Sequence, residues 1–320
     1  MPLPDQDTMD PRLAMLVAEV MSQLPADLPA LPSPWPAPGQ SRAEWLAEVT
    51  AVRAAHDAPA DVLAQLLPAA PPDAPTVSDR EVEVEGGRIT VRVYTPAGEG
   101  PFPALVYYHG GAWWLGGGFA LTDLYCQRFC AALGSVVVNV DYRLAPESPY
   151  PQQLEDAYAA LLWTVSSLRP TEVSVAGASS GGNLAAALCL LARDRGGPAI
   201  RSQLLHVPGL DLTLSSPSLR ADPAVLPNLD GVRRLYSTDW ENPYVSPLLA
   251  TDLAGLPPAV IVTGRHDFLR DDGRRYAERL SEAGVPVVAL EYPMLHNIAL
   301  PETIETMVTE MTAALLALSR

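Results

Sequence analysis

A serine flanked by small residues stands where a strand-like run gives way to a helix-like one. Gly177-Ala178-Ser179-Ser180-Gly181 follows the apolar run Val173–Ala176 and precedes Asn183–Ala192, which is rich in Ala and Leu. A sharp turn between a strand and a helix lifts a serine hydroxyl above the sheet, and small neighbours let the chain bend there. The spacing therefore predicts that Ser179 is the nucleophile of an acyl-transfer reaction.

A glycine-rich loop supplies the backbone donors that this reaction needs. His109-Gly110-Gly111-Ala112-Trp113-Trp114 comes directly after the strand-like run 104–108. In acyl transfer the carbonyl oxygen becomes an oxyanion, which fixed N–H groups stabilise. We expect these N–H groups to come from Gly110, Gly111 and Ser180.

A histidine that follows the serine in the chain is needed as general base. The sequence has five histidines: His56, His109, His206, His266 and His296. His296 comes after the strand-like run 287–292 and a short loop, which is the place expected for a base when the chain order is Ser, Asp, His. His206 lies inside a strand-like stretch, which favours a buried histidine with satisfied hydrogen bonds. His266 is a loop neighbour of Asp267, so we predict that His296 is the base.

The carboxylate that orients the histidine is predicted to be Asp267. It follows the strongly strand-like run 259–263 after a short link. Asp271 and Asp272 compete for the role, but both stand where the helix-like run 273–283 begins, and helix capping accounts for them. Position at a strand end and chain order favour Asp267.

These motifs together resemble those of the bacterial hormone-sensitive-lipase-like (family IV) esterases of the α/β-hydrolase superfamily. Further matching segments are Asp141-Tyr-Arg-Leu-Ala-Pro-Glu147, Asn242-Pro-Tyr-Val-Ser-Pro247 and His266-Asp-Phe-Leu-Arg-Asp271, and the resemblance spans about residues 80–315. It implies a mostly parallel eight-stranded sheet, a helical cap over the site, and hydrolysis of short acyl esters. It also implies that Ser179, Asp267 and His296 occupy the catalytic positions, and that Gly110, Gly111 and Ser180 occupy the oxyanion hole.

The chain departs from the family pattern around the site. Ala178 and Ser180 flank the nucleophile in place of the more usual Asp or Thr and Ala, and Ala112 replaces a third glycine in the oxyanion loop. Phe268 stands where Pro commonly follows the carboxylate, and Asn297-Ile298 replaces Gly-Phe after the base. No catalytic group is lost by these changes. They alter positions around the substrate pocket, so the substrate preference of the family is not carried over to this chain.

Two tryptophans follow the oxyanion loop. Trp113 and Trp114 are candidates for the wall of a pocket that limits acyl length, and packing under the cap is the alternative for either of them. Arg233 and Arg234 are candidates to meet an anionic leaving group, but two Arg on a helix surface are more often simply solvated. A short acyl chain, from acetyl to about hexanoyl, is what the resemblance implies.

Strands and helices alternate along most of the chain. Strand-like runs at 104–108, 136–140, 173–177, 203–207, 259–263 and 287–291 are separated by helix-like runs at 121–133, 152–167, 183–194, 272–283 and 302–318. This alternation predicts an α/β fold with a mainly parallel sheet covered by helices on both faces. An alternating segment before it, with a turn at Gly86-Gly87, predicts a hairpin.

The chain is expected to form one catalytic domain with a cap. Residues 1–75 are predicted to be an N-terminal helical cap segment, with helices at Arg12–Leu24 and Ser41–His56; Ser41 is the expected N-cap of the second, and His56 is expected to be exposed. Residues 76–320 are predicted to be the α/β-hydrolase catalytic domain. The polar, Pro-containing stretch at about 212–240 is predicted to be an insertion that completes the cap.

Composition excludes several classes of function. The net charge of −16 argues against binding nucleic acid, and the absence of Lys excludes a Lys Schiff base or a P-loop. Cys126, Cys130 and Cys189 lack metal-binding spacing, so we expect packing roles, no metal, and a reducing compartment. No apolar run approaches ~18 residues, so no membrane span is expected. With an acidic N-terminus unlike a signal peptide, these features favour the cytoplasm of a bacterium.

The sequence as a whole predicts a serine carboxylesterase that acts on a small-molecule ester through an acyl-enzyme and requires no cofactor. An amidase, a lactonase or an acyltransferase on the same triad remains an alternative, because fold and triad do not determine the acceptor. A non-catalytic small-molecule receptor is a further alternative, which the intact triad disfavours. A homodimer through the last strand, at 287–291, is permitted.

Overall fold

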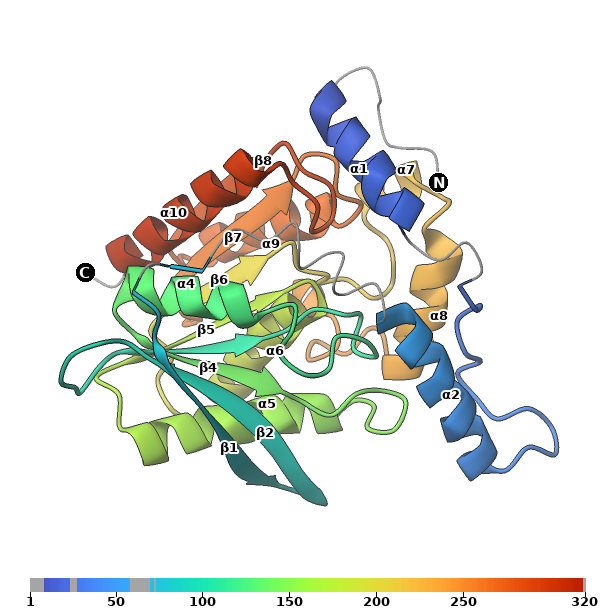
Figure 1. Cartoon of the computed structure of the whole chain (residues 1–320), viewed down its shortest axis with the longest axis horizontal. Coiled ribbons are helices and arrows are strands. Elements are labelled where there is room, and N and C mark those ends of the chain that lie inside the picture. The colour runs from blue at the N-terminus through green and yellow to red at the C-terminus, as the bar shows by residue number, and fades with distance from the viewer. Residues whose placement is uncertain (1–8, 24–27, 58–69, 72, 319–320) are drawn as a thin grey trace.

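An eight-stranded sheet runs through the centre of the computed structural model, which describes residues 9–23, 28–57, 70–71 and 73–318 (Figure 1). The strands are β1 Thr76–Val84, β2 Gly87–Thr95, β3 Ala104–Tyr108, β4 Val136–Asp141, β5 Val173–Ala178, β6 Gln203–His206, β7 Ala259–Gly264 and β8 Val287–Tyr292. Their order in the sheet is β1-β2-β4-β3-β5-β6-β7-β8. Strand β2 is antiparallel to both its neighbours, and all other pairs are parallel. The predicted fold class is confirmed.

Helices cover both faces of the sheet. One face carries α4 (Asp123–Leu133) and α10 (Pro301–Leu318); the other carries α5 (Gln152–Trp163), α6 (Ser180–Asp194) and α9 (Arg270–Glu282). Neighbouring residues of a strand point to opposite faces, so Tyr107 packs toward α4 and α10 whereas Tyr108 packs in the other core. Strands β3 and β7 are buried along their whole length, as expected of strands with two covered faces.

The hairpin turns one residue earlier than predicted. Val84 pairs with Gly87, which leaves Glu85 and Gly86 as the two turn residues. Gly86 has φ +77°, a conformation that glycine adopts without a steric cost. The glycine with the free rotation is therefore the first of the pair, and Gly87 already belongs to β2.

Among the residues that the structure describes, four helices lie beyond the carboxyl ends of the parallel strands (Figure 1): α1 (Pro11–Gln23), α2 (Arg42–Asp57), α7 (Pro217–Ala221) and α8 (Leu226–Tyr236). Helix α2 begins as predicted, because the Ser41 hydroxyl accepts from the N–H of Glu44 at 3.3 Å while the Glu44 carboxylate accepts from the N–H of Ser41 at 2.9 Å. This reciprocal pair is a capping box. The predicted apolar face of α2 is turned inward, with Trp45 and Val49 buried.

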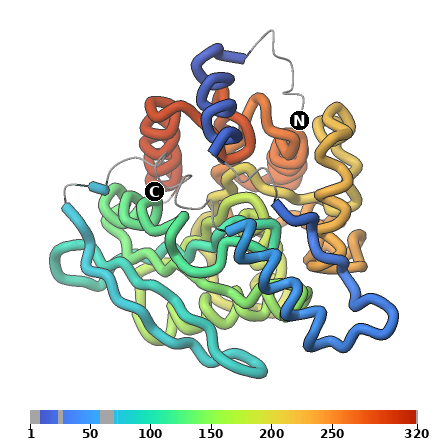
Figure 2. Tube along the Cα trace, turned by 45° about the vertical axis from the view of Figure 1, so that its right-hand side comes forward, coloured from blue at the N-terminus to red at the C-terminus, as the bar shows by residue number. Residues whose placement is uncertain are grey.

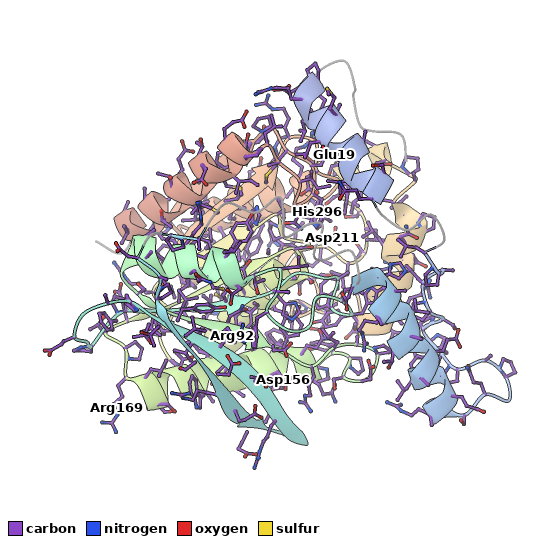
Figure 3. The ribbon with its side chains drawn as sticks, viewed as in Figure 1. Glu19, Arg92, Asp156, Arg169, Asp211 and His296 are labelled. Carbon is purple, nitrogen blue, oxygen red and sulfur yellow. The ribbon has the colours of Figure 1, made fainter. Side chains whose placement is uncertain are left out.

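Segments far apart in the sequence meet at this end of the sheet. Figures 1 and 2 show α2 beside α8, although about 170 residues separate them in the chain. Val52 of α2 packs in one apolar cluster with Val232 and Leu235 of α8 and with Trp114. Figure 3 shows His296 in the interior, between these helices and the sheet. The helices therefore enclose the region in which the predicted site residues lie.

Candidate active site

Ser179 occupies the tight turn between β5 and α6. Its backbone has φ 55° and ψ −117°, which is a strained conformation for a residue with a side chain. Two glycines allow the turn: a Cβ at Gly181 would lie 2.0 Å from the carbonyl oxygen of Tyr108, and one at Gly177 would lie 2.2 Å from that of Gly181. The N–H of Ser179 donates to the carbonyl of His206 on β6 at 2.8 Å. The strained residue is thus held by close packing and by the neighbouring strand.

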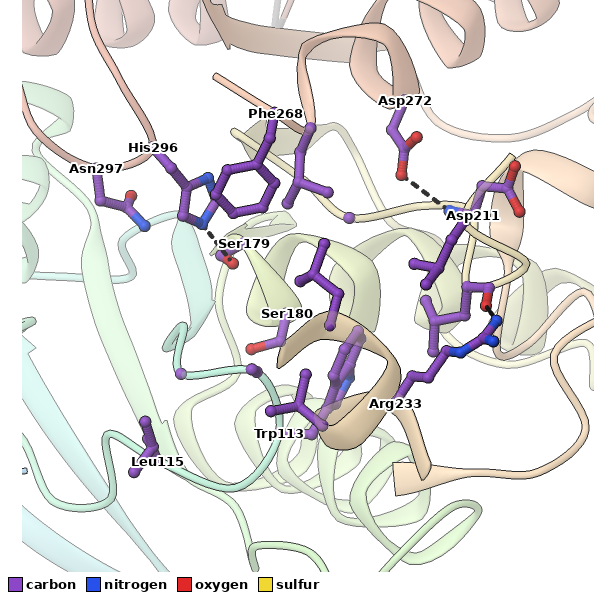
Figure 4. Close-up of a pocket in the computed structure, with 18 residues that line it drawn as sticks. Trp113, Leu115, Ser179, Ser180, Asp211, Arg233, Phe268, Asp272, His296 and Asn297 are labelled. Carbon is purple, nitrogen blue, oxygen red and sulfur yellow. Dashed lines mark hydrogen bonds between the residues drawn. The ribbon is translucent and has the colours of Figure 1, made fainter. Parts of the chain in front are cut away.

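The structure brings Ser179, His296 and Asp267 together from three separate segments. Nε2 of His296 lies 2.9 Å from Oγ of Ser179 (Figure 4). Nδ1 of His296 lies 2.9 Å from Oδ2 of Asp267. Asp267 is buried, and its other oxygen accepts from the N–H of Leu269 at 2.8 Å. Because Asp267 holds the Nδ1–H, Nε2 is free to accept the proton of the serine hydroxyl. The arrangement can activate a nucleophile.

The competing carboxylates have a different role from the one predicted. Asp272 is fully buried and accepts from the backbone N–H groups of Leu210 and Asp211, at 2.8 and 3.0 Å, and from the hydroxyl of Ser216. Asp271 accepts from the N–H of Ser218 at 2.9 Å. Neither residue caps α9, whose N-cap is Leu269, so that part of the prediction was wrong, but both stand in its first turn, where the helix dipole favours a carboxylate. Both hold the segment 210–218 against α9, and burial raises the pKa of Asp272 to about 7.

Two histidines differ from their predicted surroundings. His56 was expected to be exposed, but it is half-buried, with its ring edge-on to Trp114 at 5.4 Å and Nε2 2.9 Å from the carbonyl oxygen of Pro29. His206 is buried in β6 as predicted, yet its Nε2 has no hydrogen-bond partner among the described residues. Burial, and then the nearby His296, lower the pKa of His206 to about 4. His206 is therefore neutral at physiological pH.

The glycine-rich loop lies against the nucleophile. A Cβ at Gly110 would lie 3.0 Å from the carbonyl oxygen of Ala178 and 3.4 Å from Cβ of Ser179. Gly111, with φ +126°, lines the same cavity as Ser179 and Ser180. Glycine at 110 lets the loop backbone approach Ser179, whereas a Cβ at Gly111 would lie 2.1 Å from the carbonyl oxygen of Leu115 within the loop itself. Ser180 adds the first N–H of α6. The three predicted donor residues therefore surround Ser179.

The two tryptophans have different places. Trp113 lines the cavity and stacks on Tyr236, with ring centroids 4.5 Å apart. Trp114 is buried in the cluster between α2 and α8 and is not part of the cavity lining. Trp113 therefore forms part of the wall of a pocket, and Trp114 packs between α2 and α8.

Two departures from the family pattern have a physical account. Asn297 has φ +58°, and Asn is among the non-glycine residues that adopt this left-handed conformation most readily, so it can stand where relatives have Gly. Phe268 places its ring 4.8 Å from the ring of His296 and lines the cavity. Both residues therefore shape the surroundings of the histidine.

The cavity at Ser179 has a volume of about 280 Å³ and is mainly apolar. Sequence reasoning missed most of its cap-side lining, which comes from Leu212, Leu214, Leu229, Val232 and Arg233. Leu229 and Val232 lie in α8, where the apolar spacing was a signal, whereas Leu212 and Leu214 lie before α7 and had none. Arg233 was named from the sequence, but not as part of a pocket wall. We will call this space the active-site cavity.

The arginines of α8 are already paired. Arg233 forms an ion pair with Asp230, and its guanidinium carbon lies 3.5 Å from the ring centroid of Trp240. Its side chain is 12 % exposed, so simple solvation was the wrong expectation for it. Arg234 is 43 % exposed and also pairs with Asp230. Both guanidinium groups are thus paired with a carboxylate, and an anionic leaving group would have to compete with Asp230 for either of them.

The part of the chain that the structure describes holds no cluster of three or more His, Cys, Asp or Glu side chains that could hold a metal ion. Nor does any described helix combine the length and the apolar character needed to cross a bilayer. The three cysteines are buried and unlinked.

Comparison with known proteins places the chain. The family model described as alpha/beta hydrolase fold matches residues 105–300. Carboxylesterase NlhH of Mycobacterium tuberculosis is 41% identical over 239 residues, which are 69% of this chain and 75% of the relative. The arylesterase of Saccharolobus solfataricus is 34% identical over 224 residues, covering 66% of this chain and 72% of the relative.

Solved structures agree with this placement. A structure titled bacterial heroin esterase has a TM-score of 0.81 and 30% identity, covering 98% of this chain and 99% of its own. An esterase of Pyrobaculum calidifontis has a TM-score of 0.76 and 34% identity, covering 85% of this chain and 93% of its own. With the sheet, the turn at Ser179 and the family model in agreement, the chain belongs to the hormone-sensitive-lipase-like branch of the α/β-hydrolase fold family.

Proposed function

We propose that this protein is a serine carboxylesterase that hydrolyses short-chain acyl esters. The observation that carries the proposal is the hydrogen-bonded chain from Ser179 through His296 to the buried Asp267. Relatives that are named carboxylesterase, esterase and arylesterase support the same reaction class.

The residues have separate tasks in the proposed reaction: attack by Ser179, proton transfer by His296, and stabilisation of the oxyanion by backbone N–H groups. His296 takes the proton of Ser179 as the hydroxyl oxygen attacks the ester carbonyl carbon, and the N–H groups of Gly110, Gly111 and Ser180 stabilise the oxyanion. His296 then gives the proton to the leaving alcohol, and the acyl group stays on Ser179. Water attacks this acyl-enzyme with His296 again as base, which releases the carboxylic acid and restores the hydroxyl.

The size of the active-site cavity supports a small substrate. Its volume of about 280 Å³ is at the lower end of the range for ligand pockets, and Trp113 forms part of the wall. We expect hydrolysis of p-nitrophenyl acetate and butyrate to exceed that of the octanoate and laurate. Ser179→Ala should lower turnover roughly 10³-fold or more. Equal rates for wild type and Ser179→Ala, prepared identically, would overturn the proposal.

We propose that residues 1–75 and about 212–240 act as a cap over a catalytic domain of residues 76–320. Support comes from α2 and α8, which pack on each other beside the site, and from cap-side residues in the cavity lining. Arg53 of α2 donates to the carbonyl oxygens of Trp114 and Ala145, at 2.7 and 2.8 Å, and so joins the cap to the oxyanion loop. Limited proteolysis should cut the cap before the sheet, and a substrate analogue should slow that cleavage.

We propose two further properties, a cytoplasmic location and a homodimer. A cytoplasmic location is supported by three buried free thiols, and cell fractionation tests it.

A homodimer through β8 is supported by the position of that strand at the sheet edge, with Ala289 exposed. A sizing column should show a dimer that Ala289→Arg converts to a monomer; a monomeric wild type would overturn it.

A further inference from the structure

The catalytic histidine shares a tight turn with an asparagine. The N–H of Leu295 donates to the carbonyl oxygen of Ile298 at 3.0 Å, and the N–H of Ile298 donates back to that of Leu295 at 3.5 Å. His296 and Asn297 are therefore the two residues at the tip of the turn. Asn297 takes φ +58° there, a conformation that Gly and Asn supply at such a position. The turn thus fixes the backbone of the base and of its neighbour together.

The side chain of Asn297 is available to a ligand. It is exposed, and its amide forms no hydrogen bond with any residue that the structure describes. Figure 4 shows it beside the imidazole of His296, on the side opposite to the ring of Phe268. One flank of the base is therefore apolar, and the other carries a polar group without a partner.

Asn297 also stands where two cavities meet. The active-site cavity adjoins a second cavity of about 290 Å³, and Gly111, Leu115 and Asn297 line both of them. Gly111 has no side chain and that of Leu115 is apolar, so the amide of Asn297 is the one polar side-chain group, among the described residues, that borders both spaces. An ester that reaches from one cavity into the other therefore passes this boundary.

The direction of proton transfer tells which half of the ester comes near Asn297. In the tetrahedral intermediate the former carbonyl carbon carries four groups: Oγ of Ser179, the oxyanion, the acyl chain and the leaving oxygen. The oxyanion faces the backbone N–H groups, whereas the leaving oxygen must come within hydrogen-bond reach of Nε2 of His296 to take the proton. The first carbons of the alcohol therefore lie beside the imidazole, where Asn297 is the next residue in the turn.

We propose that Asn297 is a specificity-determining residue, whose amide hydrogen-bonds to an oxygen atom on the alcohol half of the substrate, close to the ester oxygen. This inference rests on the proposed esterase function and deepens it. The amide nitrogen can donate to a hydroxyl or an ether oxygen, and the amide oxygen can accept from a hydroxyl. The substrate class is therefore an ester of a glycol-type alcohol, in which a second oxygen stands on the carbon next to the one that bears the ester.

Two matched pairs of esters test the inference. The hydroxyl pair is 2-hydroxyethyl butyrate and propyl butyrate; the ether pair is 2-methoxyethyl butyrate and butyl butyrate. Within each pair an oxygen-containing group replaces a carbon group of similar size. The second oxygen also makes the alcohol a better leaving group, so the polar-to-apolar ratio of kcat/KM in the wild type is judged against the same ratio in a variant that lacks the amide.

Asn297→Gly is that variant, because glycine adopts φ +58° without a steric cost and has no side chain. Its polar-to-apolar ratio should be roughly fivefold lower than that of wild type in both pairs, as expected for one hydrogen bond whose protein partner is exposed to water before binding. Asn297→Asp keeps the acceptor oxygens but has no donor. It should therefore retain the preference in the hydroxyl pair and lose it in the ether pair.

Leu115→Ala is the matched control. It removes side-chain volume from the same boundary between the cavities and leaves the amide of Asn297 in place. Its polar-to-apolar ratio should not fall below that of wild type in either pair. An equal fall in Leu115→Ala and Asn297→Gly would assign the preference to the size of the space and overturn the role of the amide.

The outcomes separate this inference from the proposed function. Hydrolysis that depends on Ser179, with equal ratios in wild type and Asn297→Gly, overturns the contact with the alcohol and leaves the esterase intact. Should Asn297→Gly fail to fold, the ether pair in Asn297→Asp decides, and an unchanged ratio there overturns the inference. Absence of Ser179-dependent hydrolysis for every ester overturns the proposed function itself.

Discussion

Arg53 of α2 grips both carboxylate oxygens of Glu147, at 2.8 and 2.6 Å. The same guanidinium donates to the carbonyl oxygens of Trp114 and Ala145, so one side chain holds the cap helix, the oxyanion loop and the segment after β4. Its side chain is only 15 % exposed, which protects these bonds from competition with water.

Arg53→Met should therefore loosen the cap. The variant keeps much of the apolar stem but leaves two carbonyls and a carboxylate without their donor, which costs about 1–3 kcal/mol in unfolding free energy. Urea unfolding and kcat/KM for p-nitrophenyl butyrate measure the effect, and both should fall. Arg88→Met, which breaks the exposed ion pair with Glu83 on the hairpin, is the control and should change neither by much. Equal effects in the two variants would contradict a special role for Arg53.

Asp267→Asn should preserve the fold and abolish most activity. An amide cannot hold the Nδ1–H of His296 as a carboxylate does, so the imidazole loses the tautomer that accepts the serine proton. We expect kcat to fall about 10³–10⁴-fold with an unchanged unfolding midpoint. Asp271→Asn serves as the neighbour control and should retain far more activity. If Asp271→Asn proved the more damaging change, the carboxylate would be wrongly assigned.

Replacing Asn297 tests the backbone beside His296. Asn297→Ala places a residue with less tolerance for φ +58° at this position and should cost about 1 kcal/mol, together with a lower kcat. Asn297→Gly removes the steric conflict, so its stability should stay close to wild type. Thermal unfolding and steady-state kinetics compare the two variants. A Gly variant less stable than the Ala variant would mean that the Asn side chain, and not the backbone, matters.

The buried Asp272 should leave a mark on stability as a function of pH. Burial raises its pKa in the folded state to about 7, from the ordinary value of 3.8, so the folded protein binds the proton more tightly than the unfolded chain. The stability that this proton contributes is complete at low pH and is lost as pH rises toward 7, at roughly 1 kcal/mol per pH unit.

Asp272→Asn removes that titration. The difference in unfolding free energy between wild type and variant should grow as pH falls from 8 to 5, because only the wild type gains the proton. Denaturant unfolding at several pH values measures it. A difference that is constant with pH would show that Asp272 does not titrate in this range.

Local patterns predicted three side chains, those of Ser179, Asp267 and His296, which the structure joins by hydrogen bonds. The turn at Ser179 needs small residues in a short window, and the base and carboxylate follow strands that periodicity identifies well, so chain order was enough to select Asp267 and His296. Helix and strand type were equally local properties. The start of α6 at Ser180 and not near 183 shows the usual limit, since a helix boundary depends on how the turn before it packs.

Contacts between distant segments could not be predicted in this way. Asp272 looked like a helix cap because its partners, Leu210 and Ser216, lie about 60 residues away in sequence. Arg233 looked solvated because nothing local indicates that Trp240 folds back over it. His206 looked satisfied because the sequence does not show that its lateral neighbour in the sheet is the methyl group of Ala178.

The residues on both sides of His296 pack against α1. Leu13 and Val17 of α1 pack with Leu295, and Ile298 lies against the same cluster, so apolar contacts to a distant helix stand on both sides of the base in sequence. Asp267 orients the imidazole ring through its hydrogen bond, whereas α1 contacts the segment of chain that positions the ring. Packing of α1 against the residues on both sides of His296 therefore joins the position of the imidazole to a helix about 280 residues away in sequence.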